Sequence, residues 1–408
     1  MAQRINDTND STGGDHMSIQ RPIVTHDPEN SETPLSEMRS WVTPNVFFFV
    51  RNHFDEPNIT PETWRLQIHG QVRIPRVWTW DELAGLPERT VFATMECAGN
   101  GRSFLQQVEP GVQWGAGAVG HAEWTGVPLS AVLERSKLLS DALEILCEGA
   151  DSGTEPDHPE TMRFVRGLPL AKALHPDTLL AFRMNGEPLT RSHGAPVRLI
   201  VPGWYGVCSV KWVTRLEVLD GAFSGYFQSN KYTIRRSEGS VERKLRLTRM
   251  AVKSEIIRPG LNATLQPGVN RISGIAWAGE EAVAGVQVSV DGGATWHAAA
   301  LVGPQAPYSW ALWEYLWDAN QPGDYSLMSR ATSAAGDSQP EEHDPLRGGY
   351  MINFLRAYPV KIVGAGRAAE SWGDTVSRLD VMSHQAREFA HKRLDVELNS
   401  EFTDGGGI

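Results

Sequence analysis

The hydrophobic pattern of residues 39–245 predicts one mixed α+β domain. Residues 64–72 alternate apolar and polar side chains, as in a half-buried strand, whereas the continuous apolar run 90–95 is typical of a buried strand. Thr79 and Glu82 have the spacing of a capping box at the start of a short helix. Because the helices are short and the elements follow in irregular order, we expect an α+β fold rather than a doubly wound sheet. Further short helices are predicted from Pro128 and Pro169, and further strands over 197–201 and 210–219.

A different pattern covers residues 246–363. Short strand-like runs alternate there with turn signals, without helical runs, which predicts an immunoglobulin-like sandwich. The two end segments are polar: we expect residues 1–38 to be a disordered lead-in and residues 364–408 to be a loosely attached tail. The clearest strand-like runs are 272–277, 286–290 and 325–331.

Composition limits the class of protein. The chain has 408 residues, of which 41% are hydrophobic and 21% charged, as in a soluble globular protein of two or three domains. Its net charge of −11 argues against a nucleic-acid-binding surface but leaves room for a local basic pocket. No run of about 18 apolar residues is present, so we expect no membrane partner. We see no secretory signal and expect a cytoplasmic location, unless an export signal precedes this sequence.

The cysteines are sparse and form no Cys-x-x-Cys pair, which disfavours a structural zinc site and fits a reducing compartment. Cys147 alternates with Leu143 and Ile145, so we place all three in a core. Cys208 has no assigned role.

Cys97 stands in the most informative segment. It follows the predicted strand 90–95 and precedes a turn of small residues that leads to Arg102. Free backbone amides and a nearby cation lower the pKa of a thiol and make it a ligand or a nucleophile. The alternative is a buried core cysteine, which is the more common environment of a lone cysteine.

Two further segments combine polar groups with apolar anchors. Three aromatic residues precede Arg51, Asn52 and His53, and the Arg51 guanidinium suits a bidentate oxyanion contact. A glycine-rich region carries His193, Arg198 and Lys211 around predicted strand ends, which suits a bulky anion with a phosphate and a polar heterocycle. The alternative is solvated surface charge, since alternation with Val210 and Trp212 would point Lys211 away from their face.

Taken together, these segments resemble the sulfite oxidase family of molybdopterin enzymes over about residues 40–360. The motifs are Cys-Ala-Gly-Asn at 97–100, Val-Arg-Asn-His at 50–53, His-Gly-Ala-Pro-Val-Arg at 193–198, and Val-Pro-Gly-Trp followed by Val-Lys-Trp within 201–212. The resemblance implies an α+β molybdopterin-binding domain over residues 39–245. It also implies an immunoglobulin-like domain over residues 246–363 that forms a homodimer.

The resemblance also implies roles for individual residues. Cys97 would be the thiolate ligand of molybdenum, a soft ligand suited to such a metal. Arg51 and Arg102 would line the substrate oxyanion pocket, with Trp114 beside it and Arg347 as a further pocket arginine. Tyr232 would be the tyrosine near the metal. The implied cofactor-binding residues are Phe49, Val50, Arg51, Asn52, His53, Cys97, Asp151, His193, Arg198, Ser209, Val210 and Lys211.

The implied activity is oxidation of sulfite to sulfate by oxygen-atom transfer. No haem-binding domain precedes residue 40, so we expect no haem and an external electron acceptor such as oxygen or a cytochrome. Gly101 stands where the animal enzymes carry another arginine, which makes the pocket less cationic. One alternative keeps the cofactor but changes the substrate, to sulfane sulfur or to S- or N-oxides that are reduced. A second is a cofactor-free scaffold, against which the presence of Cys97 argues.

Overall fold

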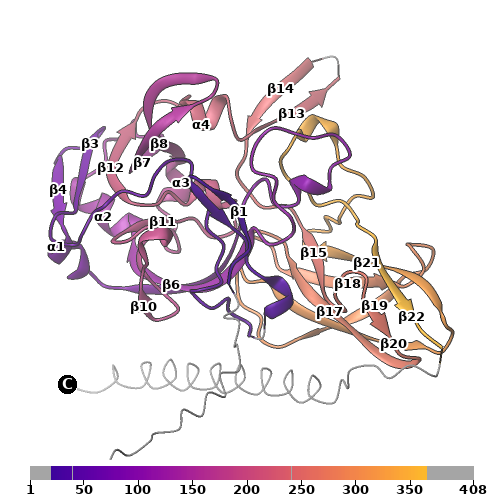
Figure 1. The fold of residues 1–408 in the computed structure, drawn as a ribbon. Helices are drawn as coiled ribbons and strands as arrows, with labels where there is room; N and C mark the ends of the chain where they lie inside the picture. The colour runs from indigo at the N-terminus through magenta and orange to yellow at the C-terminus, as the bar shows by residue number, and fades with distance from the viewer. Residues whose placement is uncertain (1–19, 39, 240, 365–408) are drawn as a thin grey trace, which may run out of the picture.

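The computed structural model describes residues 20–364 apart from positions 39 and 240. Two five-stranded sheets build its first unit (Figure 1). One sheet has the order β10-β9-β6-β5, with β11 also paired to β9, and the other has the order β4-β3-β12-β7-β8. Pairing is antiparallel except between β12 and β3. The strands are β3 (Arg65–Gly70), β4 (Arg76–Thr79), β5 (Arg89–Glu96), β6 (Val119–Pro128), β7 (Glu144–Glu155), β8 (His158–Pro169), β9 (Leu179–Met184), β10 (Glu187–Pro188), β11 (Arg198–Ile200) and β12 (Val213–Leu219).

Short helices join these strands, as predicted. The capping box is present: the Thr79 hydroxyl accepts from the Glu82 amide at 3.3 Å, and the Glu82 carboxylate accepts from the Thr79 amide at 2.8 Å. The helices are α1 (Trp80–Ala84), α2 (Leu129–Ser136), α3 (Leu170–Ala173) and α4 (Tyr226–Ser229). The 3₁₀ turns are η1 (Leu35–Glu37), η2 (Arg102–Phe104), η3 (Arg191–His193), η4 (Gly206–Cys208) and η5 (Pro345–Arg347).

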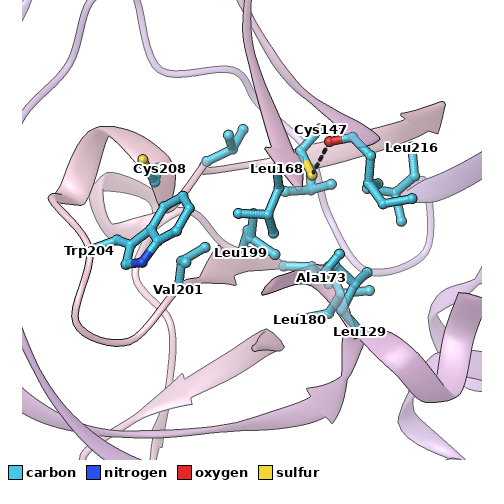
Figure 2. Close-up of a cluster of buried hydrophobic side chains, with 14 of the residues drawn as sticks. Leu129, Cys147, Leu168, Ala173, Leu180, Leu199, Val201, Trp204, Cys208 and Leu216 are labelled. Atoms are coloured by element: carbon cyan, nitrogen blue, oxygen red, sulfur yellow. Dashed lines mark hydrogen bonds between the residues drawn. The ribbon is translucent and has the colours of Figure 1, made fainter. Parts of the chain in front are cut away.

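Apolar side chains from both sheets and the helices form the main core. Figure 2 shows part of it, where Leu129, Leu168, Leu180, Leu199 and Leu216 gather near the two cysteines. The cysteines of this core, Cys147 and Cys208, are both buried. All three cysteines are buried, but neither Cys147 nor Cys208 lines a pocket that Cys97 lines.

The prediction for the neighbours of Cys147 was partly wrong. Ile145 is fully buried with it, but Leu143 is 60% exposed. The reason is that β7 begins at Glu144, so Leu143 lies outside the strand and outside its alternation.

The second unit is an all-β sandwich, which confirms the predicted order of an α+β unit followed by an immunoglobulin-like one (Figure 1). Strand β19 pairs with β18 through its first half and with β20 through its second half, so it joins the two layers. Side chains such as Ile272, Val288, Trp313 and Leu327 fill the space between them. The strands are β15 (Lys253–Arg258), β16 (Thr264–Leu265), β17 (Gly268–Trp277), β18 (Val283–Ser289), β19 (His297–Val302), β20 (Ala311–Ala319), β21 (Gly323–Ser333) and β22 (Tyr358–Ile362).

The prediction of a disordered lead-in was wrong for residues 20–38. They form β1 (Ile23–His26), β2 (Glu29–Ser31) and η1. The amide of Ser31 donates to the Val50 carbonyl at 3.0 Å and the amide of Val50 donates back at 2.9 Å, while the Asn30 side chain accepts from the Asn52 amide at 2.9 Å. Some polar groups of this segment therefore form hydrogen bonds within the protein, which hold the segment against residues 50–52. Residues 1–19, and the predicted tail from 365 onward, lie outside the described residues.

A separate two-stranded ribbon joins the two units. It consists of β13 (Thr233–Glu238) and β14 (Val241–Arg246), which pair with each other and with no other strand of the described chain. Figure 1 shows it standing out from the body beside the late yellow segment that contains η5.

Among the helices of the described residues, none is both long and apolar enough to cross a membrane.

Candidate active site

Cys97 lies directly after β5, at the start of a tight turn. Its amide donates to the Ala118 carbonyl at 2.8 Å and its carbonyl accepts from the Asn100 amide at 2.9 Å. Gly101 has φ +96°, a left-handed conformation that favours glycine. Burial raises the pKa of the Cys97 thiol, and the opposing influence of Arg51, the Gly99 amide and Arg102 is smaller. The sequence-based expectation of a lowered thiol pKa is therefore wrong for the chain by itself, because the side chain is only 7% exposed.

A buried ionic cluster supports this turn from the second unit. Lys253 of β15 places its Nζ 3.3 Å from Glu96 Oε1, 3.2 Å from the Asn100 carbonyl and 3.6 Å from Glu255 Oε1. The indole of Trp277 donates to Glu96 Oε2 at 2.9 Å. Glu96 and Asn100, which flank Cys97, are thus held by side chains of the sandwich. Burial raises the pKa of the Glu96 carboxyl in spite of these hydrogen-bonding and charged partners.

An inner cavity of about 630 Å³ opens on one side of Cys97. It receives His193 from η3, Arg198 from β11 and Lys211 from the turn before β12. Trp212 in this turn has φ +49°, so the strand predicted from 210 begins only at Val213 and the turn directs Lys211 into the cavity. The predicted residues that line the cavity are Phe49, Arg51, His53, Cys97, Asp151, His193, Arg198, Ser209, Lys211 and Tyr232.

The cavity holds positive charge without matching carboxylates. The Arg198 guanidinium donates to the carbonyls of His193 at 3.0 Å and Ser209 at 3.2 Å, and its buried Nε has no partner among the described residues. Burial lowers the pKa of Arg198 to about 9. Lys211 donates to the Ser192 carbonyl at 2.9 Å, and desolvation followed by repulsion from Arg198 lowers its pKa to about 7.

In the described part of the chain, neither Arg198 nor Lys211 forms an ion pair within 4.0 Å. Asp151 is the carboxyl at this cavity, and burial raises its pKa to about 6, with Lys211 opposing. Buried cations whose partners are mostly neutral carbonyl oxygens are costly, so the site fits a ligand that carries negative charge. Burial and the neighbouring Arg198 lower the pKa of His193 to about 3, so this imidazole is neutral and offers hydrogen bonds without charge.

Three predicted residues lie behind the cavity wall. The side chains of Val50 and Val210 are buried, and Val210 also accepts from the Leu199 amide at 2.7 Å. Asn52 accepts from the Lys211 ammonium and donates to Glu56 Oε1 at 3.0 Å. These residues hold the wall in place: Val50 pairs with β2, and Asn52 orients Lys211.

A second, outer pocket of about 1150 Å³ meets the inner cavity at four shared residues: Arg51, His53, Cys97 and Tyr232. Arg102, Trp114 and Arg347 also line it, as predicted. Arg102 is fixed by donation to the Val112 carbonyl at 2.7 Å and the Gly349 carbonyl at 3.0 Å. The indole Nε1 of Trp114 is buried without a partner in the described chain. The outer pocket therefore presents a fixed guanidinium and one buried donor without a partner in the described chain.

Tyr232 and His53 form a close pair at the junction of the two pockets. Their hydroxyl and Nε2 are 2.6 Å apart, and the Arg51 guanidinium donates to the same hydroxyl at 3.5 Å. Burial, followed by repulsion from Arg51, lowers the pKa of His53 well below its usual value, while burial raises the pKa of Tyr232. Since a guanidinium only donates, the tyrosine proton points to the neutral imidazole.

Several lining residues were missed from the sequence. The inner cavity also includes Phe48, Met95, Phe164 and Trp212, and the outer pocket also includes Lys231, Arg235, Lys244 and Tyr350. Phe48 and Trp212 belong to the quoted motifs and could have been found there. The run of basic residues from 231 to 246 was a visible charge signal, but its place at the pocket follows only from the fold.

Comparison with known proteins gives two matching family models. One, described as the oxidoreductase molybdopterin binding domain, matches residues 53–227. The other, described as the Mo-co oxidoreductase dimerisation domain, matches residues 244–357. The inner cavity is lined mainly by residues within the first match, the outer pocket is lined about equally by residues inside and outside it, and strands β15 to β21 of the sandwich lie within the second match.

Individual relatives agree with these matches. The mitochondrial sulfite oxidase of Drosophila melanogaster is 33% identical over 367 residues, which cover 82% of this chain and 62% of that protein. The sulfite oxidase of Gallus gallus is 32% identical over 362 residues, 83% of this chain and 77% of that protein. The crystal structure of the sulfane dehydrogenase SoxCD from Paracoccus pantotrophus superposes with a TM-score of 0.74 at 30% identity, covering 87% of this chain and 93% of that one.

Proposed function

Because the chain belongs to the sulfite oxidase family of molybdopterin-binding oxidoreductases, we propose that it oxidises sulfite to sulfate and passes the electrons to an external acceptor. The observation that carries this proposal is the junction of the two pockets. A single thiol, Cys97, stands between a cation-lined inner cavity and a cation-lined outer pocket. The inner cavity suits an anionic cofactor, and the outer pocket suits a small anionic substrate.

The donors of the inner cavity fit a molybdenum–molybdopterin cofactor. Arg198 and Lys211 would pair with its phosphate, and the neutral His193 would hydrogen-bond to its polar atoms. Cys97 would be the protein ligand of the metal, which holds a coordinated thiol as thiolate whatever its pKa in the free chain. When bound, this cofactor supplies oxygen-atom transfer and takes up the two electrons.

The protein residues would bind the substrate and orient the polar groups around it. Arg51, Arg102 and Arg347 would attract the oxyanion and neutralise it within the outer pocket. Conversion of one sulfite and one water to sulfate releases two protons and two electrons. The lowered pKa of His53 and the raised pKa of Tyr232 keep both groups neutral, so this pair, whose hydroxyl and Nε2 are 2.6 Å apart, would orient polar groups at the pocket junction by hydrogen bonds.

A second candidate keeps the cofactor and oxidises sulfane sulfur. The likeness to the Paracoccus sulfane dehydrogenase over 93% of that chain favours it. Reduction of S- or N-oxides uses the same cofactor in the opposite direction. The three activities use different substrates: sulfite or sulfane sulfur donates electrons to the protein, whereas an S- or N-oxide accepts them. Turnover measured with each substrate therefore separates them.

The test combines two measurements on one sample purified from a host that makes the cofactor. We expect about one molybdenum per chain and sulfite-dependent reduction of ferricyanide. Molybdenum without sulfite turnover would overturn sulfite as the substrate. The same sample would then be assayed for oxidation of a persulfide and for reduction of S- or N-oxides. Absence of metal would overturn the cofactor and favour a scaffold.

We also propose that the protein is a homodimer. The match of residues 244–357 to a dimerisation domain supports this. Light scattering after size-exclusion chromatography should give twice the chain mass of 45.0 kDa, and a mass of one chain would contradict the proposal.

A further inference from the structure

The β13–β14 ribbon places like charges directly opposite each other. Arg235 faces Lys244 across the ribbon, and Arg236 faces Arg243. Like charges in such cross-strand pairs destabilise a sheet, and a two-stranded ribbon is only marginally stable to begin with. One acidic residue, Glu242, approaches Arg235 at 3.6 Å, and both side chains are more than half exposed, so this pair adds little. The ribbon therefore concentrates positive charge at a cost in its own stability.

The two pairs lie on opposite faces of the ribbon, because side chains alternate along a strand. Arg235 and Lys244 line the outer pocket together with Lys231, whereas Arg236 and Arg243 do not. Lys244 also reaches the Asn230 carbonyl at 3.5 Å, which keeps it over the entrance.

The charge of this entrance is opposite to that of the whole protein. Six cations line the outer pocket (Arg51, Arg102, Lys231, Arg235, Lys244 and Arg347) against two carboxylates (Glu109 and Glu155), and two further carboxylates outside the lining approach Lys231 at 3.3 Å and Arg347 at 3.8 Å (Asp157 and Asp344). The protein carries a net charge of −11, so a small anion is repelled at long range. A cationic rim offsets this repulsion where the pocket opens and raises the local concentration of anions.

We propose that Arg235 and Lys244 form an anion-collecting rim that draws small oxyanion substrates into the outer pocket. The identity of the oxyanion as sulfite rests on the proposed function, but the attraction of a doubly charged oxyanion does not. The rim acts on the approach of the substrate and leaves the chemical step to the residues around Cys97.

The chain offers a matched control. The pocket-facing variant is Arg235→Gln/Lys244→Gln, and the control variant is Arg236→Gln/Arg243→Gln. Both remove the same net charge from the same ribbon, but only the first pair lines the pocket. The loss of repulsion should leave the pocket-facing double variant at least as resistant to urea as the parent protein, and urea unfolding of both double variants guards against a folding artefact.

The first measurement is the second-order rate constant for reduction of the cofactor-loaded protein by sulfite, without any acceptor. We expect the pocket-facing variant to lose on the order of fivefold at about 0.02 M ionic strength, and the difference to vanish near about 0.5 M. The control variant should stay within about twofold of the parent protein throughout.

The second measurement does not depend on turnover. Sulfate binding, followed by tryptophan fluorescence because Trp114 lines the pocket, should weaken on the order of fivefold at low salt in the pocket-facing variant alone. If the protein does not oxidise sulfite but sulfate binding weakens only in the pocket-facing variant, the role of the rim is supported and the proposed function is wrong. Equal effects in both variants, or no effect on sulfate, would overturn the rim. Slower reduction of an acidic protein acceptor with unchanged sulfate binding would also overturn it.

Discussion

Replacement of Lys253 by methionine tests whether the second unit holds the turn of Cys97. Methionine keeps much of the side-chain volume but removes the ammonium that lies 3.3 Å from Glu96, 3.2 Å from the Asn100 carbonyl and 3.6 Å from Glu255. Lys253, Glu96 and Glu255 are exposed by only 4%, 2% and 3%. The variant therefore leaves carboxylates in the interior without their shared cation.

The expected loss can be worked from these contacts. Removal of one partner of a buried ion pair costs about 3–5 kcal/mol. Glu96 keeps the donors of Trp277 and Asn100, and Glu255 keeps Arg356 at 2.5 Å, so we expect the lower end, about 3 kcal/mol of the free energy of unfolding.

The loss should also depend on pH in a defined direction. Burial already raises the pKa of the Glu96 carboxyl, and loss of Lys253 raises it further. A carboxyl whose pKa is higher in the folded state stabilises the fold at low pH and loses this contribution as the pH rises through that pKa. The variant should therefore be less impaired at about pH 5.5 than at about pH 8.

Urea unfolding followed by tryptophan fluorescence measures both effects. Lys253→Met/Glu96→Gln should recover part of the loss and its pH dependence, because the amide carries no charge. Lys361→Met is the control, since Lys361 is 62% exposed and 3.9 Å from Asp324, and it should cost less than about 0.5 kcal/mol. A loss below about 1 kcal/mol for Lys253→Met, or one independent of pH, would refute the reasoning.

Further predictions concern the site and the core. Cys97→Ser should abolish sulfite turnover without lowering the urea midpoint, whereas Cys147→Ser, in the apolar core, should keep turnover; residual activity in Cys97→Ser would contradict its role as the ligand. Arg51→Gln should raise the KM for sulfite far more than it lowers molybdenum content, and an unchanged KM would show that Arg51 does not contact substrate. Burial lowers the pKa of His121 to about 3, so the stability contributed by its neutral form is present above its unfolded value of 6.5 and is lost as the pH falls. Acidification from about pH 7 to about pH 5 should cost about 2 kcal/mol more in the parent protein than in His121→Phe, and equal losses in denaturant titrations would refute this.

Local signals predicted much of the fold. Residues 65–70 and 89–96 are strands, and the capping box at Thr79 starts a helix, because each pattern reports burial or capping within a few residues. The cationic motifs around Arg51 and Arg198 were found for a similar reason: each is continuous in sequence.

The rest depends on contacts between distant segments. Residues 20–38 are polar enough to suggest disorder, yet Asn30 and Ser31 are buried because residues 50–52 supply their partners. The direction of Lys211 follows from the left-handed backbone of Trp212, which alternation does not reveal. The rim residue Arg235 is brought to the pocket by the fold of the whole ribbon.

The order of the pocket walls along the chain has a consequence for synthesis of the protein. Every residue that lines the inner cavity lies between Phe48 and Tyr232, whereas the last wall of the outer pocket is the segment 346–350. Gly349 and Tyr350 in this segment bond to Arg102 and to the Tyr232 amide. A ribosome therefore releases every residue that lines the cofactor chamber more than a hundred residues before the segment that completes the entrance. Lys253 and Trp277, which hold the turn of Cys97, also leave the ribosome before that segment, so the entrance is the last part of the site to be synthesised.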